Sequence, residues 1–352
     1  MDQKKLAKIA ELRVKLGEYP KIDLVNFLTP IEPLRNVSAD IGLETLVKRE
    51  DLVGPAFGGH YAHSMEYVFG EVIEGGYDGI VQGGPSHSNQ NRLIAAICAK
   101  LGLKAHLVLR KKLEVDQPDI GNLFLDQLVG ADISWVTAEM GPELDGEKTK
   151  RYLELREVNG ENPYLFRRDR ISLISTLGML DFFLKLYEQL DRDGKIPSSI
   201  YLTGCGPTHS GILLGARLID PSIKIVGVRP LHWDAQDIVS NEVNTAAKTL
   251  GEQLAITRDE VVNPAEYVGK DYGILTREGA RAIQYFAMKE GLIFDPVYTG
   301  KMAACFLDDA HLGKIEKGSR VLLIHSGGTP LTLLYSRQIY SELGMSLMNP
   351  SP

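Results

Sequence analysis

The stretch LVKREDLVGPAFGG, residues 46–59, ends in a double glycine, and the amphipathic run HYAHSMEY, residues 60–67, follows it directly. A glycine-rich turn that opens a helix usually prepares a site for a small, often anionic, group. Such a site normally carries a lysine or an arginine, but the four residues after Gly59 are His60, Tyr61, Ala62 and His63. The sequence therefore predicts a binding loop that lacks its usual cation.

Composition and charge exclude several classes of function. The chain has 352 residues, 44% hydrophobic and 24% charged, which is typical of a globular protein with a sizeable core. Its net charge of -7 argues against nucleic acid or an anionic membrane as the main partner, because both need a basic face. No apolar run approaches the roughly 18 residues that span a bilayer. Residues 1–20 lack the apolar segment of a secretory signal, so we expect a cytoplasmic protein.

Short apolar runs alternate with amphipathic ones along the chain. Strands are predicted over residues 77–84, 104–110, 198–204, 224–230 and 319–328. Helices are predicted over residues 89–102, 175–193, 209–219, 276–290 and 329–343. Strand–helix alternation with glycines at strand ends predicts an α/β protein with mainly parallel sheets. We expect the site in a cleft between two such lobes.

Glycine-rich loops follow three of these strands, at the edge where open α/β sheets bind ligands. The loops are QGGPSHSNQN (82–91), TGCGPTHSG (203–211) and HSGGTP (325–330). In the second loop, Gly204, Gly206, Thr208 and Ser210 offer N–H groups and hydroxyls just before a helix. This pattern predicts a phosphate or carboxylate cradle, and a tight strand-to-helix turn without a ligand is the alternative. The loop matches neither a P-loop nor a GxGxxG fingerprint.

Six motifs together resemble one enzyme family in their order along the chain. They are LVKREDLVGPAFGG (46–59), HSNQNR (87–92), TGCGPTHSG (203–211), DYGILTREG (271–279), FDPVYTGKM (294–302) and IHSGG (324–328). The order is that of the D-cysteine desulfhydrases and 1-aminocyclopropane-1-carboxylate deaminases, fold-type II enzymes that depend on pyridoxal phosphate (PLP). The resemblance covers nearly the whole chain. It implies a large domain, residues 1–57 plus 176–352, and a small domain, residues 58–175, with the cofactor between them.

The resemblance fails at the residue that should hold the cofactor. It implies an Asn-Lys pair after the double glycine, whose lysine forms the Schiff base with PLP, but this chain has His60 and Tyr61. A lysine that helps to hold the cofactor phosphate is replaced by Ser64. Tyrosine cannot form an imine, so PLP is expected to bind noncovalently or to be absent. Imine chemistry on another lysine, such as Lys48 or Lys301, is the remaining alternative.

Other site residues of the family are present. The resemblance assigns a catalytic or substrate-side role to Ser88, Tyr272 and Tyr298, beside Tyr61 as the proposed proton-transfer group. It assigns cofactor contacts to Asn89 at the ring hydroxyl and to Thr299 at the pyridine nitrogen. The phosphate loop corresponds to Gly204, Cys205, Gly206, Pro207 and Thr208.

The remaining polar residues of the motifs leave alternatives open. The substrate-side candidates are His60, His63, His87 and Ser326. A metal site on the histidines is an alternative, since imidazole is a common ligand, but ordinary hydrogen-bonding roles fit their pattern better. Arg167, Arg168 and Arg170 form either a carboxylate site or a solvated loop. Cys205 is either a nucleophile at a helix N-terminus or a packing residue.

Two hypotheses of function follow. The first is a divergent lyase or deaminase that acts on a small, carboxylate-bearing, amino-acid-like substrate, with Tyr61 transferring the proton. The second is a catalytically silent ligand-binding or regulatory homologue, or a PLP-independent enzyme that reuses the cleft. In either case we expect a small-molecule ligand, a homodimer, and neither nucleic acid nor membrane as a partner. The spacing of Cys98, Cys205 and Cys305 predicts free thiols.

Overall fold

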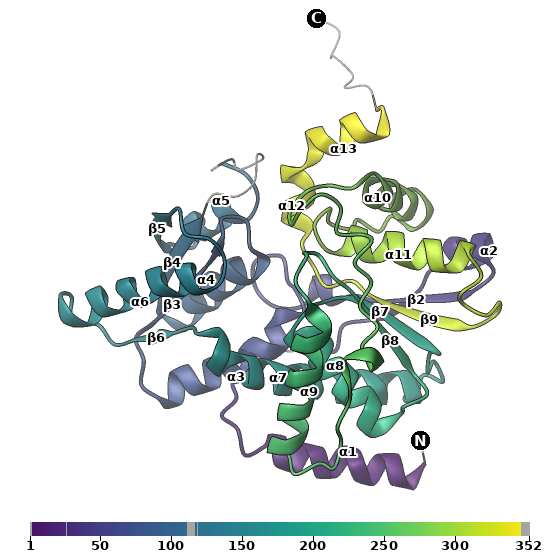
Figure 1. Ribbon diagram of the computed structural model, residues 1–352, viewed down its shortest axis with the longest axis horizontal. Coiled ribbons are helices and arrows are strands. Elements are labelled where there is room, and N and C mark those ends of the chain that lie inside the picture. Colours follow the sequence, from purple (N-terminus) through teal and green to yellow (C-terminus); the bar gives the residue numbers. More distant parts are fainter. Residues whose placement is uncertain (1, 26, 111–116, 118, 346–352) are drawn as a thin grey trace, which may run out of the picture.

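The computed structural model of the protein describes residues 2–25, 27–110, 117 and 119–345, whose strands form two separate sheets (Figure 1). The larger sheet has the order β1-β2-β9-β7-β8, and the smaller has the order β5-β4-β3-β6. All strand pairs are parallel except that of β1 with β2. The mainly parallel α/β architecture predicted from the sequence is confirmed.

The strands of the two sheets come from different parts of the chain. The larger sheet contains β1 (Ile31–Pro33), β2 (Glu44–Lys48), β7 (Ser199–Thr203), β8 (Lys224–Val228) and β9 (Arg320–Ile324). The smaller sheet contains β3 (Gly79–Pro85), β4 (Lys104–Arg110), β5 (Asp132–Val136) and β6 (Pro163–Leu165). Each sheet forms, with its helices, one lobe of the molecule, and α3 and α7 lie between the two lobes (Figure 1).

Helices connect and cover the strands. In the first half of the chain they are α1 (Gln3–Leu16), α2 (Arg35–Ile41), α3 (Tyr61–Glu74), α4 (Asn89–Leu101), α5 (Gly121–Leu128), α6 (Pro142–Glu157) and α7 (Arg168–Arg192). In the second half they are α8 (Pro207–Ile219), α9 (Ala235–Thr249), α10 (Arg277–Glu290), α11 (Thr299–His311), α12 (Thr329–Leu334) and α13 (Ser336–Leu343). Short 3-10 turns span Glu50–Leu52 and Arg258–Glu260. None of the described helices combines the length and apolar character that a membrane crossing requires.

Local signals explain where several of these helices begin and end. Ser88 caps α4 by accepting a hydrogen bond from the backbone N–H of Asn91, and Gly102 ends the helix in the left-handed conformation. The helix predicted over residues 329–343 is two helices, because the chain turns at Tyr335, whose ring is buried and whose hydroxyl donates to the carbonyl oxygen of Gly273. Helix α7 begins at Arg168, so the domain boundary predicted at residue 175 falls inside a continuous helix.

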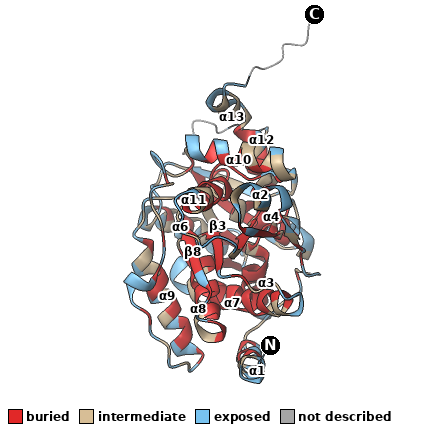
Figure 2. Cartoon of the chain, turned by 90° about the vertical axis from the view of Figure 1, so that its right-hand side faces the viewer, coloured by how far each residue is buried: buried red, intermediate tan, exposed pale blue. Residues whose placement is uncertain are grey.

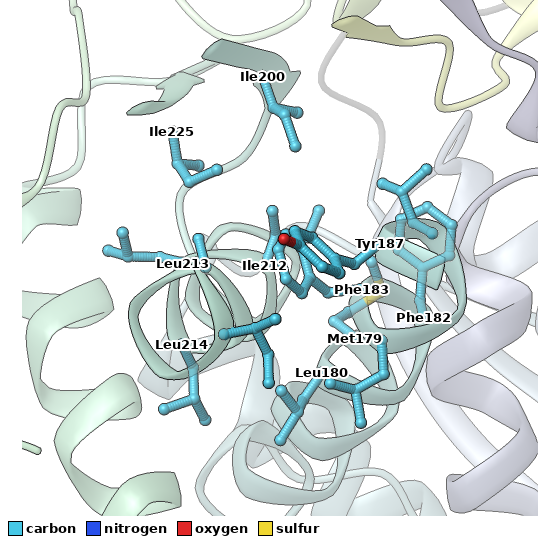
Figure 3. Close-up of a cluster of buried hydrophobic side chains, with 14 of the residues drawn as sticks. Met179, Leu180, Phe182, Phe183, Tyr187, Ile200, Ile212, Leu213, Leu214 and Ile225 are labelled. Carbon is cyan, nitrogen blue, oxygen red and sulfur yellow. The ribbon is translucent and has the colours of Figure 1, made fainter. Parts of the chain in front are cut away.

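The core is built around α7, which is buried over most of its length and appears red in Figure 2. Its apolar side chains pack against α8 and the larger sheet, as the close-up of this cluster shows (Figure 3). Small residues allow the helices to approach closely. A Cβ added at Gly211 of α8 would lie 2.5 Å from Cβ of Met179, and one added at Gly178 of α7 would lie 2.8 Å from Cα of Ser64. This packing fixes α3 and α8, whose N-termini face the site.

Candidate active site

A cavity of about 510 Å³ lies between the two lobes. Its size is typical of small-molecule sites. Most of the residues that the sequence predicted for the site line this cavity: His60, Tyr61, Ser88, Asn89, Gly204, Cys205, Gly206, Pro207, Thr208, Tyr272, Tyr298 and Ser326. His63, His87 and Thr299 are not among the lining residues. A second cavity, of about 1010 Å³, lies around Trp135 and Pro142, and none of the predicted site residues lines it.

The loop before α3 takes its cation from elsewhere in the chain. The guanidinium of Arg92, on α4, donates to the carbonyl oxygen of Gly58 at 2.9 Å and also to that of Ala56. Ala56 and Phe57 both have positive φ, at 51° and 70°, and a Cβ at Gly58 would lie 2.3 Å from the carbonyl oxygen of Asp51. Arg92 therefore holds a tightly wound loop in place, and it also lines the cavity.

Three tyrosines converge on the cavity. Tyr61 is the first residue of α3, and within the described residues its hydroxyl has no hydrogen-bond partner. The hydroxyls of Tyr272 and Tyr298 lie 2.6 Å apart. Burial raises the pKa of all three phenols, that of Tyr272 to about 12. All three phenols therefore keep their protons near pH 7 and are able to donate hydrogen bonds.

His60 and His63 point in different directions although they lie three residues apart. His60 precedes α3 at the cavity, where its Nε2 lies 2.8 Å from Oγ1 of Thr208. His63 is buried away from the cavity with its Nε2 2.6 Å from Oε2 of Glu50. Burial alone would raise the pKa of Glu50, but His63 and the nearby Lys48 ammonium lower it to about 2. His63 thus belongs to a buried polar network with Glu50 and does not line the cavity.

Two lysines weighed as alternative imine formers are fixed elsewhere. Nζ of Lys48 donates to the carbonyl oxygen of Thr29 at 2.6 Å, and Nζ of Lys301 donates to that of Val268 at 2.6 Å. Neither lysine lines the cavity. Among the described lining residues the one lysine is Lys148 on α6, whose Nζ lies 2.7 Å from Oδ1 of Asp145.

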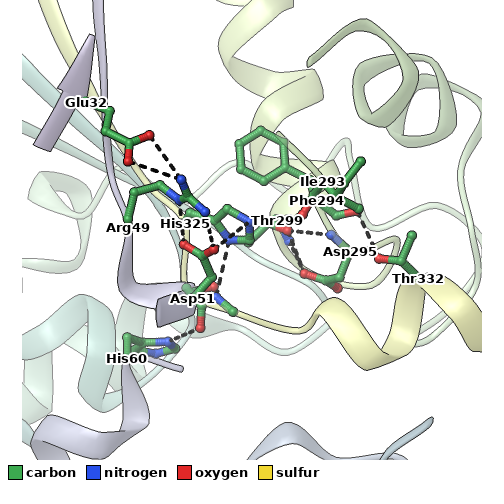
Figure 4. A network of polar contacts seen from close by, with 12 residues as sticks. Glu32, Arg49, Asp51, His60, Ile293, Phe294, Asp295, Thr299, His325 and Thr332 are labelled. Atoms are coloured by element: carbon green, nitrogen blue, oxygen red, sulfur yellow. Dashed lines mark hydrogen bonds and ion pairs between the residues drawn. The ribbon is translucent and has the colours of Figure 1, made fainter. Parts of the chain in front are cut away.

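Thr299 belongs to a buried polar network at the start of α11 (Figure 4). Its hydroxyl donates to Oδ2 of Asp295 at 2.6 Å and accepts from the backbone N–H of Asp295 at 2.8 Å. Asp295 is fully buried, which raises its pKa. His325 lies close by, with Nε2 3.0 Å from the carbonyl oxygen of Ile293. Thr299 therefore fixes the start of α11, directly after Tyr298.

The cradle at the start of α8 keeps several backbone donors available. Within the described residues, no hydrogen bond is made by the N–H groups of Cys205, Gly206 and Thr208, whereas that of Gly204 donates to Val228. Pro207 has no N–H. Burial raises the pKa of the Cys205 thiol to about 11, so this residue is an unreactive thiol at neutral pH. The first turn of a helix and its free N–H groups favour an anion here.

One arginine of the predicted cluster reaches this cradle. Arg168 lines the cavity, and its guanidinium carbon lies 4.6 Å from the ring centre of Trp233. Arg167 pairs with Asp169 at 2.7 Å, and Arg170 covers the ring of Tyr164. The sequence did not distinguish Arg168 from its neighbours, because it does not show which face of a helix start turns toward the cavity.

Two further residues of the site have no sequence signal. Glu242, on α9, lies beside the cradle, and Trp233 lines the cavity above Arg168.

Within the described residues, no three His, Cys, Asp or Glu side chains are placed to hold a metal ion. The polar groups that line the cavity include phenols, imidazoles, hydroxyls, amides and charged side chains such as Arg168 and Lys148.

Comparison with known proteins identifies the class to which this architecture belongs. The family model of the pyridoxal-phosphate dependent enzymes matches residues 22–327, and the chain belongs to that family. A putative 1-aminocyclopropane-1-carboxylate deaminase of Pyrococcus abyssi is 32% identical over 342 residues, covering 93% of this chain and 97% of the relative. The D-cysteine desulfhydrase of Serratia proteamaculans is 30% identical over 335 residues, which cover 93% of this chain and 99% of the relative. The crystal structure of an ACC deaminase homologue superposes with a TM-score of 0.83 at 31% identity, and the match covers 94% of this chain and 99% of the homologue.

The cavity offers PLP only part of what the cofactor needs. At the cradle, free N–H groups and Arg168 are suited to an anionic group. At the start of α3, the resemblance places Tyr61 where the family has its imine-forming lysine, and a phenol cannot form an imine. Among the described residues, the one lysine that lines the cavity is Lys148, which pairs with Asp145, so these residues do not fit a covalently tethered PLP.

Proposed function

We propose that the protein is an enzyme that cleaves a bond in a small, carboxylate-bearing, amino-acid-like substrate without an imine to a lysine of its own. The observation that carries this proposal is the position of Tyr61. Its hydroxyl faces the cavity between the anion cradle and the Tyr272–Tyr298 pair, and no described group accepts its proton. The site thus combines an anchor for a carboxylate with a free proton donor.

The chemistry assigned to the chain's own residues is binding and proton donation. The N–H groups of Cys205, Gly206 and Thr208 and the guanidinium of Arg168 hold the carboxylate. Burial raises the pKa of Tyr61, so its hydroxyl holds a proton near neutrality. In this proposal Tyr61 passes that proton to the leaving group, and the phenolate then takes up the proton that the substrate loses. The Tyr272–Tyr298 pair adds a neutral donor toward developing negative charge. Arg92 keeps α3 in register with the cavity by holding the preceding loop.

Turnover on a substrate panel tests this proposal. Purified protein is incubated, with and without added PLP, with D- and L-cysteine, 1-aminocyclopropane-1-carboxylate and other small amino acids, and ammonia and 2-oxo acid are measured. We expect turnover of at least one compound without added PLP. Tyr61→Phe should then lower kcat by about 10²–10⁴, the loss typical of a positioned proton donor, with a much smaller change in KM. Unchanged kcat in Tyr61→Phe would rule out the proton-donor role.

A silent ligand-binding homologue is the second candidate, and the state of His60 favours it. Burial lowers the pKa of His60 to about 4, and both ring nitrogens are already within hydrogen-bond distance of protein oxygens. This histidine is therefore not available as a base. If the panel gives no turnover while thermal shifts reveal a bound carboxylate, the binding role replaces the enzymatic one.

Assembly and location are proposals as well. We propose that the protein is cytosolic, in keeping with its three free cysteines, of which Cys98 and Cys305 are buried. We also propose that it forms a homodimer. Light scattering on the purified protein measures the oligomeric state. A monomer at micromolar concentration would contradict the proposed dimer.

A further inference from the structure

The carboxylate of Glu242 approaches the anion cradle from α9. Its Oε1 accepts a hydrogen bond from Oγ of Ser172 at 2.5 Å, and its Oε2 accepts one from Oγ of Ser210 at 2.7 Å. Ser172 lies on α7, and Ser210 lies in the first turn of α8. The two hydroxyls fix the carboxylate directly beside the N-terminus of α8.

Gly206 separates this carboxylate from the cation of the cradle. A Cβ built at Gly206 would lie 3.8 Å from each carboxylate oxygen of Glu242 and 3.9 Å from Nη2 of Arg168. One negative and one positive side chain thus flank the same backbone turn. Their charges roughly cancel, so the cradle attracts an anion mainly through its N–H groups and the helix dipole.

From this geometry we infer that Glu242 makes the cradle selective for singly charged carboxylates over phosphate dianions. The inference rests on the proposed function, because it takes the cradle as the site of the substrate's anionic group. A dianion beside Glu242 meets twice the repulsion that a carboxylate meets, while Arg168 supplies a single compensating charge. Pro207 also removes one N–H group from the turn, which leaves fewer donors for the three oxygens of a phosphate.

Burial destabilises the ionised form of Glu242. Burial raises the pKa of this carboxyl, while hydrogen bonds from Ser172 and Ser210 and the charge of Arg168 oppose that effect only in part. The start of α3, which contacts the cradle through His60 and Thr208, also departs from the needs of PLP, because Tyr61 stands where the resemblance places the imine-forming lysine.

Tryptophan fluorescence can measure anion binding at the cradle. The chain has two tryptophans, Trp135 and Trp233, and only the second lines this cavity, against Arg168. In a Trp135→Phe background, inorganic phosphate and acetate are titrated separately at pH 8 and constant ionic strength. We expect Glu242→Gln to tighten phosphate binding roughly tenfold to hundredfold. The logarithm of the gain in acetate affinity should be less than half the logarithm of the gain in phosphate affinity.

Control variants separate this effect from general changes in charge or folding. Asp237→Asn removes a carboxylate from the same helix, where Asp237 pairs with the exposed Arg258, and it should leave both affinities unchanged. Glu242→Ala should reproduce the phosphate gain if Glu242→Gln folds poorly. If both anions bind but the ratio of their affinities stays constant in both Glu242 variants, the selectivity role of Glu242 is wrong and the proposed function stands. If neither anion binds in any variant, the cradle itself, and with it the proposed function, is wrong.

Discussion

His60 and Thr208 join α3 to the cradle, with Nε2 of the histidine 2.8 Å from Oγ1 of the threonine. The other ring nitrogen, Nδ1, lies 3.1 Å from the carbonyl oxygen of Ser326. Since a carbonyl oxygen can only accept, Nδ1 carries the proton, and Nε2 accepts from the Thr208 hydroxyl. The hydroxyl proton is thus directed at His60, so an anion in the cradle would be held by the backbone N–H groups and Arg168 and not by this hydroxyl.

Buried neutral histidines should make the fold sensitive to mild acid. The pKa is lowered by burial to about 4 for His60 and to about 3 for His209, both below the ordinary value of 6.5. As pH falls below about 6.5 the unfolded chain takes up protons that the folded chain does not, so stability is lost. We expect the free energy of unfolding to fall by about 2 kcal/mol per histidine between pH 7 and pH 5.

Urea unfolding at the two pH values measures this loss. Within the described residues neither ring nitrogen of His209 has a hydrogen-bond partner, so His209→Leu removes the titrating ring without breaking a bond. That variant should lose about 2 kcal/mol less stability between pH 7 and pH 5 than the wild type. His232→Leu, at an exposed histidine, is the control. An unaltered pH dependence in His209→Leu would contradict the prediction.

Borohydride treatment should leave no pyridoxyl group on the wild-type protein. The start of α3 carries Tyr61, and Lys48 and Lys301 are held by hydrogen bonds outside the cavity. Protein is incubated with PLP, reduced, digested and analysed by mass spectrometry, with a lysine-bearing family member as the positive control. A stoichiometric adduct on Lys148, the one lysine among the described residues that line the cavity, would revive imine chemistry on a substitute lysine.

A lysine at position 61 should restore cofactor attachment only when the cradle also accepts phosphate. We expect Tyr61→Lys alone to bind PLP weakly, because Glu242 remains beside the cradle. Tyr61→Lys/Glu242→Gln should bind PLP at least about tenfold more tightly and turn yellow. Absorbance of the imine band is followed during titration with PLP, and Tyr61→Arg is the control that cannot form an imine. A double variant that stays colourless would show that the cavity has diverged beyond PLP.

Close packing of α7 on α8 depends on glycines. A Cβ at Gly211 would lie 2.5 Å from both Cβ of Met179 and the carbonyl oxygen of Thr176, so Gly211→Ala should destabilise the fold by about 1–3 kcal/mol. Gly146 in α6 has nothing within 4 Å of the corresponding position, and Gly146→Ala should stabilise by about 0.5–1 kcal/mol through helix propensity. Chemical denaturation measures both. Equal effects of the same sign would refute the packing argument.

The sequence by itself determined the architecture, because the signals for it are local. Hydrophobic periodicity and glycine punctuation placed α4, β4 and β7 to within about two residues. The motifs 46–59 and 294–302 predicted the family, and they place Tyr61 where the resemblance implies the imine-forming lysine. Most of the residues predicted for the site line one cavity, since loops at the carboxyl ends of parallel strands meet there.

Only the tertiary structure decided which charges meet at the cradle. Glu242 lies 36 positions from Gly206 and shares no motif with it, yet helix packing brings its carboxylate beside that glycine. The same packing selects Arg168 from three neighbouring arginines and turns His63 toward Glu50 while His60 remains at the cavity. Side-chain direction depends on how α3, α7 and α9 are rotated against one another. That rotation is fixed by long-range contacts that no local pattern encodes.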